Sequence, residues 1–439
     1  MGGDATNPRP VSAEEHAESA YQALRAPGET ASRRAEAIEA FRQACRAIEQ
    51  RGPEAVQQIA EIVSLPKPAL ESKARCAARI LAEVGTIEAA QALVRIALHP
   101  DILVAGRALG ALSSLRISQA AQTMLIDAIR GASGGAEGQR RSLLADGLAR
   151  QLLSGPDFDA TLWAKTHPLP DVRSAWARAI ARSTMQSLAD SGPATAHLPA
   201  LLEDPDSSVR AWAAFGLVLA GETRYLTTLA RCARSRRSDE RASAIGLLGV
   251  LPLTEAVPPV LTATDDRSPL VARAAIVRAG SLGVRSGLVA VASQLASKRA
   301  DVVEQAAWTL RELLGADPGF TWVGRRLTPA SAAAILTKCR AIHERWPPRT
   351  RYLRGQPMTA AAVAETLSRG EGDTRAAFFT LQGMSGRSFG YDPAADEIAN
   401  RGAIESLVEW AAEQGRAFAP GAFYFRGERV LGPTGAHGA

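Results

Sequence analysis

The chain of 439 residues contains little cysteine, and its four cysteines are far apart. Cys45, Cys76, Cys232 and Cys339 form no CxxC pair, so their spacing supports neither a disulfide framework nor a cysteine-based zinc site. This usage is typical of a reducing compartment, and we expect a cytoplasmic location. The first ten residues are polar and lack the apolar segment of a signal peptide, so none is expected.

Long hydrophobic runs and aromatic residues are also scarce. The longest weakly charged stretch, residues 244–264, contains Pro252, Pro258 and Pro259 and therefore does not have the composition of a transmembrane helix. Aromatic residues make up 5% of the chain, and β-branched residues do not dominate. Alanine and arginine are abundant and favour helices, so the composition predicts an all-α protein.

The excess of positive charge is small and dispersed. The formal net charge is +6, and acidic residues alternate with the 51 basic ones, of which five are lysine. The densest basic run, residues 231–237, is followed at once by Asp239 and Glu240. Nucleic-acid binding needs clustered charge, because its affinity comes from many simultaneous phosphate contacts. The charge pattern therefore does not favour a nucleic-acid partner.

A short pattern recurs along the chain: a turn rich in Asp, Ser and Pro, then a residue pair such as Val-Arg, then small apolar residues at helical spacing. The clearest copy is residues 204–217, and similar segments occur at 71–78, 101–108, 170–177, 238–244, 268–275 and 299–307. Corresponding positions are about 31 to 37 residues apart, counting one weak copy near residue 138. This period accommodates two helices of about a dozen residues and two turns.

The apolar residues of each copy fit one face of a helix. Val209, Trp212 and Leu217, for example, recur at i, i+3 and i+8. Asp and Ser before the second helix of each copy are suitable N-caps, and glycines at 85, 221, 283 and 315 suit the C-terminal ends. One helix pair cannot bury its apolar face alone, so we expect the pairs to stack into a continuous core.

Over residues 55–316 this pattern resembles the HEAT-repeat family, including the shorter HEAT-like repeats of bacterial proteins. The resemblance implies a right-handed α–α superhelix, or solenoid, of about eight helical hairpins followed by a helical C-terminal region. In such repeats the acidic turn residue and the arginine after valine commonly form a ladder of bonds between neighbouring units. By resemblance, Asp171 with Arg173 and Asp206 with Arg210 are candidates for this structural role.

The flanking segments depart from the repeat. We expect residues 1–12 to be disordered, residues 13–54 to form an N-terminal helical cap, residues 328–415 to form a helical region and residues 416–439 to form an aromatic, glycine-rich tail. The repeat near residue 138 deviates most, because it contains a glycine-rich loop at 131–138. The sequence GRSFGYDP at 386–393, before a helix that carries a tryptophan, resembles the C-terminal segment of some bacterial HEAT-repeat proteins of unassigned role.

Linear motifs for catalysis or cofactor binding are missing. Residues 383–387 approach G-x-S-x-G, but position 387 is arginine and a helix, not a strand, is predicted before it. The glycine-rich loop lacks the Lys-Ser/Thr of a phosphate-binding loop, and the six histidines are isolated, with no HExxH. We therefore expect no cofactor, no metal site and no enzymatic activity.

We therefore expect the protein to act by binding a partner on the surface of the repeat array. The second helices line the concave face of HEAT-like arrays, and exposed Trp and Arg are frequent binding hot spots. The same tryptophans also suit the core, and the same arginines could pair with acidic residues of adjacent units. The candidate partner-binding residues are Trp176, Arg178, Trp212, Arg241, Arg273, Arg278 and Arg311.

The leading hypothesis is a non-catalytic scaffold or adaptor that binds a protein partner on the concave face. One alternative is a nucleic-acid-associated HEAT-like protein of the DNA-binding or base-excision type, which predicts a continuous positive concave stripe. The other is an accessory protein that resembles the HEAT-like lyase or chaperone subunits that attach bilin chromophores, which predicts a cleft for a tetrapyrrole. The sequence leaves the oligomeric state open.

Overall fold

The computed structural model describes residue 15 and the ranges 31–67, 70–97, 99, 101–112, 165–167, 170–186, 195–324, 326–370, 372–392 and 397–430. These residues are mainly helical, with three two-stranded hairpins, which confirms the all-α class. The predicted disordered segment 1–12, the loop at 131–138, the repeat near residue 138 and the end of the tail from residue 431 lie outside the described residues. The chain falls into two compact units, residues 1–179 and 180–439.

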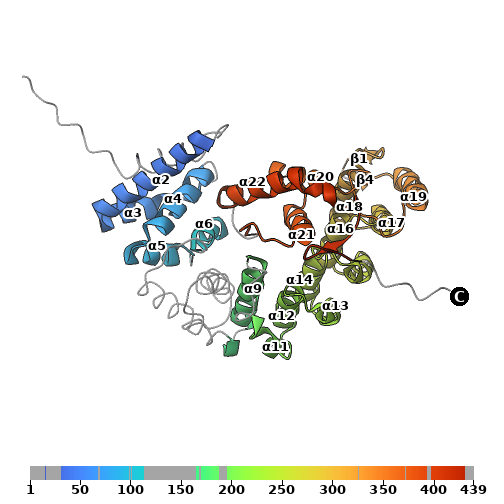
Figure 1. Ribbon diagram of the computed structural model, residues 1–439, viewed down its shortest axis with the longest axis horizontal. Helices are drawn as coiled ribbons and strands as arrows, with labels where there is room; N and C mark the ends of the chain where they lie inside the picture. Colours follow the sequence, from blue (N-terminus) through green and yellow to red (C-terminus); the bar gives the residue numbers. More distant parts are fainter. Residues whose placement is uncertain are drawn as a thin grey trace, which may run out of the picture. The chain divides into compact units, whose positions relative to one another are not determined.

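In unit 1, successive helices form stacked pairs (Figure 1). Helix α3 packs on α4 and α5, and α6 packs on the same two helices. Ile59, Ile80 and Leu93 are completely buried between them, as the helical spacing of apolar residues predicts. The described helices of this unit are α2 (Ala31–Arg51), α3 (Pro53–Ser64), α4 (Glu71–Val84), α5 (Ile87–Ala97), α6 (Ile102–Leu112) and most of α9 (Pro170–Gln186).

A buried arginine joins three of these helices. Arg107 of α6 donates from Nε and Nη2 to Oε2 of Glu71, at 2.9 and 2.6 Å, and from Nη1 to the Val63 carbonyl at 2.8 Å. Burial alone would raise the pKa of Glu71, but hydrogen bonds from Arg107 and Arg75 hold it below its ordinary value. Such links between consecutive repeats fix how one helix pair packs on the next.

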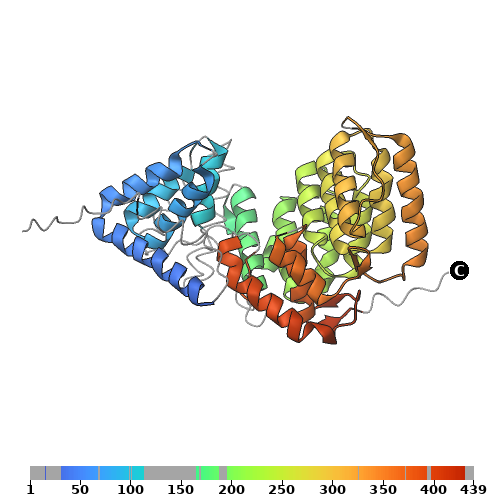
Figure 2. The same ribbon diagram turned by 90° about the horizontal axis from the view of Figure 1, so that it is seen from above.

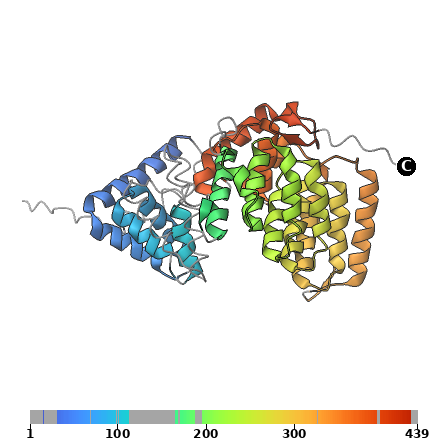
Figure 3. The same ribbon diagram turned by 90° about the horizontal axis from the view of Figure 1, so that it is seen from below.

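Unit 2 begins with a row of repeat helices. Helices α12, α14, α16 and α18 lie side by side in this order, and α13, α15 and α17 pack against them from one side. Figures 2 and 3 show the row in the colours from green to orange. The bounds are α11 (Leu198–Leu201), α12 (Ser207–Leu219), α13 (Leu226–Cys232), α14 (Ser238–Leu248), α15 (Val257–Ala263), α16 (Pro269–Leu282), α17 (Arg285–Ser293) and α18 (Ala300–Leu314), with 3-10 turns η3 (Thr223–Tyr225), η4 (Thr254–Ala256) and η5 (Gln294–Ala296).

Local signals explain where these helices begin and end. Asp206 is the N-cap of α12, and its Oδ1 accepts the backbone N–H groups of Ser208 at 2.8 Å and Val209 at 3.3 Å. Gly283 ends α16 in the left-handed conformation, with φ of 68°. A Cβ atom at Gly283 would lie 2.3 Å from the carbonyl oxygen of Tyr352. Only glycine therefore fits here, because a later segment of the chain passes close to this helix end.

The C-terminal part of unit 2 combines helices with three antiparallel hairpins. Helix α19 packs on α17, α20 packs on α21 and α22, and strand β5 packs on α21. Two of the hairpins turn through a residue pair with positive φ, Arg354-Gly355 and Arg426-Gly427, as tight two-residue turns require. The elements are β1 (Trp322–Val323), β2 (Arg326–Leu327), α19 (Pro329–Arg345), β3 (Tyr352–Leu353), β4 (Gln356–Pro357), α20 (Ala360–Arg369), α21 (Thr374–Ser385), α22 (Glu397–Glu413), η6 (Gly415–Ala417), β5 (Tyr424–Phe425) and β6 (Glu428–Arg429).

This C-terminal part returns to the repeat helices of its own unit. Helix α21 contacts α16, and β3 contacts α18. The backbone N–H of Tyr352 donates to the Gly283 carbonyl at 2.7 Å, and Nε2 of Gln382 donates to the Met185 carbonyl at 2.7 Å. We call the described residues of 350–430 the C-terminal cover, and its strand β3 and helix α21 pack on the second helices. Among the described residues, no helix combines the length and the apolar composition needed to cross a bilayer.

Candidate functional site

The C-terminal cover buries part of the surface that the sequence suggested for a partner. Trp212 of α12 is 7% exposed and its ring centroid lies 5.7 Å from that of Phe215. Phe379 of α21 packs edge-on against Phe215 at 5.8 Å, and the guanidinium carbon of Arg375 lies 6.0 Å from the Trp212 ring centroid. The aromatic side chains of α12 thus contact helix α21 of the same chain.

The other candidate tryptophan of the second helices lies in the interior. Trp176 of α9 is 1% exposed and belongs to the core. Arg178, two residues later, is half-buried and has partners in the structure. Neither side chain offers a partner the free surface that the sequence hypothesis requires.

Arg278 of α16 forms an ion pair with Asp373, 95 residues later in the sequence. Asp373 also accepts a hydrogen bond from Ser281 Oγ at 2.6 Å and, as the N-cap of α21, one from the Ala376 N–H at 3.1 Å. Burial alone would raise the pKa of Asp373, but the charge of Arg278 and these hydrogen bonds hold it below its ordinary value. The acidic group expected from a partner is therefore supplied by the chain itself.

Arg351 is the most deeply buried cation of this contact. It is 3% exposed, and it donates to the carbonyls of Leu282 at 3.0 Å and Ser281 at 3.1 Å and to Oγ1 of Thr380 at 3.0 Å. Its guanidinium carbon also lies 5.3 Å from the Phe423 ring centroid. Burial lowers the pKa of Arg351 to about 10, so its charge is kept at neutral pH. One side chain thus joins α16, α21 and the tail.

The two candidate ladder arginines donate hydrogen bonds to carbonyls of their own turns. Nη1 of Arg173 donates to the His167 carbonyl at 2.7 Å, and Nη1 of Arg210 donates to the carbonyl of Asp204, again six residues earlier. Asp206 acts as the α12 N-cap instead of pairing with Arg210. The side chain of Asp171 lies outside the described residues. The arginine forms these bonds because the carbonyls of its own turn lie within reach of its side chain.

A link between neighbouring repeats comes from Arg241, which holds the place of Arg210 in the next repeat. Nε and Nη2 of Arg241 donate to the two carboxylate oxygens of Asp266, at 2.9 and 2.8 Å, 25 residues later. Nη1 of Arg241 also donates to the Ser235 carbonyl at 2.9 Å, six residues earlier. Burial alone would raise the pKa of Asp266, but the hydrogen bond from Arg241 holds it below its ordinary value. Arg241 is buried in this pair, so it presents little surface to a partner.

Part of the second-helix surface stays exposed beside the cover. Leu270 of α16 is 55% exposed and Trp308 of α18 is 44% exposed. Arg273, three residues after Leu270 on α16, lies 3.8 Å from Asp301 of α18. We call Leu270, Arg273, Asp301, Glu304 and Trp308 the exposed stripe.

Arg311, the last of the candidates, lies one turn beyond Trp308 on α18. It is exposed and donates to Oδ2 of Asp317 at 2.7 Å. Its guanidinium carbon lies 5.1 Å from the Phe320 ring centroid. Arg273 and Arg311 are therefore the two candidate arginines with accessible charge, whereas Arg241 and Arg278 are held in buried pairs.

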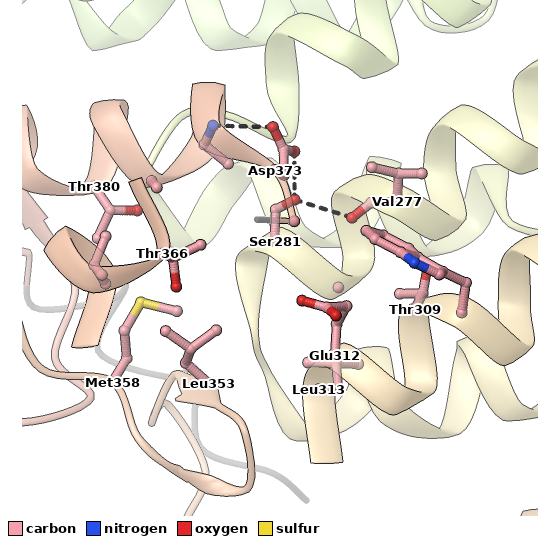
Figure 4. Close-up of a pocket in the computed structure, with 16 residues that line it drawn as sticks. Val277, Ser281, Thr309, Glu312, Leu313, Leu353, Met358, Thr366, Asp373 and Thr380 are labelled. Carbon is pink, nitrogen blue, oxygen red and sulfur yellow. Dashed lines mark hydrogen bonds between the residues drawn. The ribbon is translucent and has the colours of Figure 1, made fainter. Parts of the chain in front are cut away.

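A pocket lies where the exposed stripe meets the cover, between α16 and α18 on one side and α20 and α21 on the other (Figure 4). We call it the seam pocket, and its volume is about 70 Å³. Trp308 and Glu312 of α18 line it beside Asp373 of the cover. The remaining lining residues are Val277, Gly280, Ser281, Thr309, Leu313, Leu353, Met358, Val363, Thr366, Gly372, Ala376, Ala377 and Thr380.

The sequence provided no signal for this pocket, because its residues come from segments up to about 100 positions apart. It also missed Arg351, which lies in a basic run, residues 345–354, that reads as a solvent-exposed face or a charged patch. Asp373 could have been found as an N-cap signal before a predicted helix, but its pairing with Arg278 could not.

The described residues hold no group of three or more His, Cys, Asp or Glu side chains suited to a metal ion. All four cysteines are buried, and none of them forms a disulfide. Burial raises the pKa of Cys45 to about 12 and that of Cys339 to about 11, so these thiols stay protonated at neutral pH.

No protein-family model matches this chain, and no curated protein matches it. Among solved structures, E. coli YibA is similar at 18% identity, over 58% of this chain and 95% of YibA, with a TM-score of 0.28. Human deoxyhypusine hydroxylase in complex with glycerol is similar at 17% identity, over 68% of this chain and 96% of that one, with a TM-score of 0.30. The complex of CpcE and CpcF of phycocyanin lyase from Nostoc is similar at 17% identity, over 72% of this chain and 99% of that one, with a TM-score of 0.26.

These similarities concern the fold alone, which is that of HEAT-like helical repeat proteins. They correct one expectation. An enzyme, human deoxyhypusine hydroxylase, is among the similar structures, so the expectation that this chain is not an enzyme does not stand. The physical reason is that stacked repeats bring side chains from distant segments together, and the lack of a short linear motif therefore does not exclude catalysis.

Proposed function

We propose that this protein binds a protein partner through the exposed stripe of α16 and α18. The observation that carries the proposal is Trp308, a large aromatic side chain that remains 44% exposed beside the half-exposed Leu270. Tryptophan and arginine contribute most to binding free energy at protein interfaces, and Arg273 lies on the same stripe. A partner with an apolar side chain opposite Trp308 and an acidic group opposite Arg273 fits this surface.

The charges around the stripe favour a protein over a nucleic acid. Arg273 lies 3.8 Å from Asp301, and Glu304 is exposed on the same helix. In the basic run at 231–237, Arg237 pairs with Asp239 at 2.6 Å and with Glu240 at 3.3 Å. A phosphate backbone requires several uncompensated cations in a row, and these acidic neighbours oppose it.

We further propose a reducing, cytoplasmic setting for this interaction. Its support is that all four cysteines are buried and that none of them forms a disulfide. A chain that matures in an oxidising compartment would more often use its cysteines in disulfides.

Site-specific photo-crosslinking tests the stripe. A Trp308→p-benzoylphenylalanine variant is expected to capture a defined partner in the native cell, because the probe then lies inside the interface. A Val323→p-benzoylphenylalanine variant is the matched control, since Val323 is also exposed but lies on β1, outside the stripe. Equal capture of the same proteins at both positions would contradict the proposal.

Quantitative pull-down sharpens the test with charge. An Arg273→Glu variant is expected to lower recovery of the cross-linked partner at least about tenfold, which corresponds to about 1.4 kcal/mol. Arg241→Glu is unsuitable as a probe, because it would place two carboxylates together in the buried site of Asp266. Arg340→Glu, at an exposed site of α19 outside the stripe, serves as the control and is expected to leave recovery unchanged.

A further inference from the structure

The seam pocket has mostly apolar walls. Val277 of α16, Leu313 of α18, Leu353 of β3 and Val363 of α20 line it, together with Met358. Its volume of about 70 Å³ is several times the roughly 10–15 Å³ that one water molecule needs by the same kind of measure. The pocket therefore has room for a short organic group, and its walls favour an alkyl chain.

The charged side chains that line the pocket are all acidic. Glu312 and Asp373 are its charged lining residues, and none of the described residues that line it is Lys, Arg or His. The carboxylate of Asp373 is already compensated by Arg278. Glu312 is half-buried and forms no hydrogen bond or ion pair with the described part of the chain. A half-buried carboxylate without a counter-ion attracts a cation from outside.

Two further groups in the pocket are the Trp308 indole and the Thr309 hydroxyl. The indole of Trp308 is exposed at the pocket, and the face of an indole attracts cations. Oγ1 of Thr309 is buried, and in the described structure it has no hydrogen-bond partner. This oxygen has almost no accessible surface, so recognition of a cation in the pocket rests on Glu312 and Trp308. Figure 4 shows Thr309 and Glu312 from α18 in this wall.

We propose that the seam pocket binds an alkylammonium group. The Glu312 carboxylate and the Trp308 indole bind the charged head, and Val277, Leu313 and Met358 contact the alkyl chain. This proposal goes beyond the proposed function, because the exposed stripe can bind a protein while the pocket is empty. The alkylammonium can belong to a free small amine or to a lysine side chain of a partner, and the two sources share this chemistry.

Titration of the full chain with n-hexylammonium, n-hexanol and hexanoate, followed by ligand-observed NMR, tests the class of ligand. The ammonium compound is expected to bind at least about tenfold more tightly than the alcohol of the same length, and hexanoate is expected not to bind. Equal binding of the ammonium compound and the alcohol would overturn the proposal, because Glu312 would then contribute nothing.

Two matched variants locate the charge that matters. Glu312→Gln keeps the shape of the side chain and is expected to reduce the affinity for n-hexylammonium to that for n-hexanol. Glu344→Gln removes an exposed carboxylate from α19, outside both the pocket and the exposed stripe, and is expected to leave the affinity unchanged. Equal losses in the two variants, or no loss in Glu312→Gln, would overturn the proposal. Circular dichroism of both variants checks that each one is folded.

A pair of peptides separates the two sources of the amine. Competition of n-hexylammonium by a lysine-containing peptide, but not by the same peptide with an acetylated lysine, supports a partner's side chain as the ligand. Binding of n-hexylammonium without such competition supports a free amine. Photo-crosslinking at position 308 in the Glu312→Gln background keeps the proposals distinguishable. Capture of the partner that persists there leaves the stripe supported even when the pocket fails its own test.

Discussion

Two tryptophans on equivalent repeat helices of unit 2 have opposite environments. Trp212 of α12 is 7% exposed beside Phe215 and Arg375, whereas Trp308 of α18 is 44% exposed at the seam pocket. Trp308 lies six residues after the repeat's valine and Trp212 only three, so the counterpart of Trp308 in α12 is Phe215. Phe215 is completely buried because Phe379 of α21 packs over it, whereas the C-terminal cover leaves this part of α18 open.

Two arginines of one helix show the same contrast. Arg278 of α16 is held by Asp373 from the cover, while Arg273, five residues earlier, is exposed and lies 3.8 Å from Asp301. A covered section and an exposed section thus divide the surface of the second helices. The comparison teaches that the chain's own C-terminal part decides which section is available to a partner.

Removal of an aromatic ring from the cover is expected to have the largest effect. Phe379 is almost completely buried, with ring contacts to Phe215 and Phe378, so Phe379→Ala is expected to destabilise unit 2 by about 3–5 kcal/mol. Urea denaturation measures the loss. Val323→Ala, at an exposed position, is the control and should change stability by less than about 0.5 kcal/mol. A similarly small change for Phe379→Ala would mean that the cover is not part of the folded core.

Loss of the buried cation is expected to have the next largest effect. Arg351→Met leaves the carbonyls of Ser281 and Leu282 without their donors, and each unsatisfied buried acceptor costs about 1–3 kcal/mol. Part of this cost is offset because the cation no longer needs to be buried, so we expect a net loss of about 2–3 kcal/mol. Limited proteolysis should then cleave the chain between α19 and α20. Arg345→Met, on an exposed side chain, should leave the cleavage pattern unchanged.

The ion pair of Asp373 predicts a dependence on pH. The pKa of Asp373 is lower in the folded protein than in the unfolded chain, so its contribution is complete above about pH 4 and is lost as the pH falls through the folded-state value. Asp373→Asn should cost about 1–2 kcal/mol at neutral pH and should reduce the fall in urea midpoint between neutral and acidic pH. Asp301→Asn, at an exposed carboxylate, should show the same fall in urea midpoint as the wild type. If the urea midpoint of Asp373→Asn falls as much as that of the wild type, other groups control the loss of stability at acidic pH.

Substitution in the exposed section is expected to have the smallest effect on stability. Trp308→Ala should change the free energy of unfolding by less than about 1 kcal/mol, because much of the side chain already contacts solvent. Trp212→Ala, the matched variant in the covered section, should cost about 3–5 kcal/mol. Thermal and urea denaturation of the two variants test the comparison directly, and equal losses would remove the distinction between the two sections.

Much of the helical framework could be predicted from the sequence. Asp206 caps α12, and Gly85, Gly283 and Gly315 end their helices in the left-handed conformation, because these signals act within a few residues. The partners of the arginines could not be predicted in the same way. The sequence pattern around Arg210 and Arg241 is similar, yet Arg210 bonds its own turn and Arg241 also reaches Asp266 of the next repeat.

The sequence by itself determined the helices and their stacking, because helical periodicity and caps are local and every repeat needs a neighbour to bury its apolar face. Only the tertiary structure decided that Trp212 and Arg278 are covered, that Trp308 is exposed and that Glu312 faces an apolar pocket. These outcomes depend on contacts such as that of Arg278 with Asp373, 95 residues apart. Contacts over such distances leave no periodic or motif-like trace in the chain.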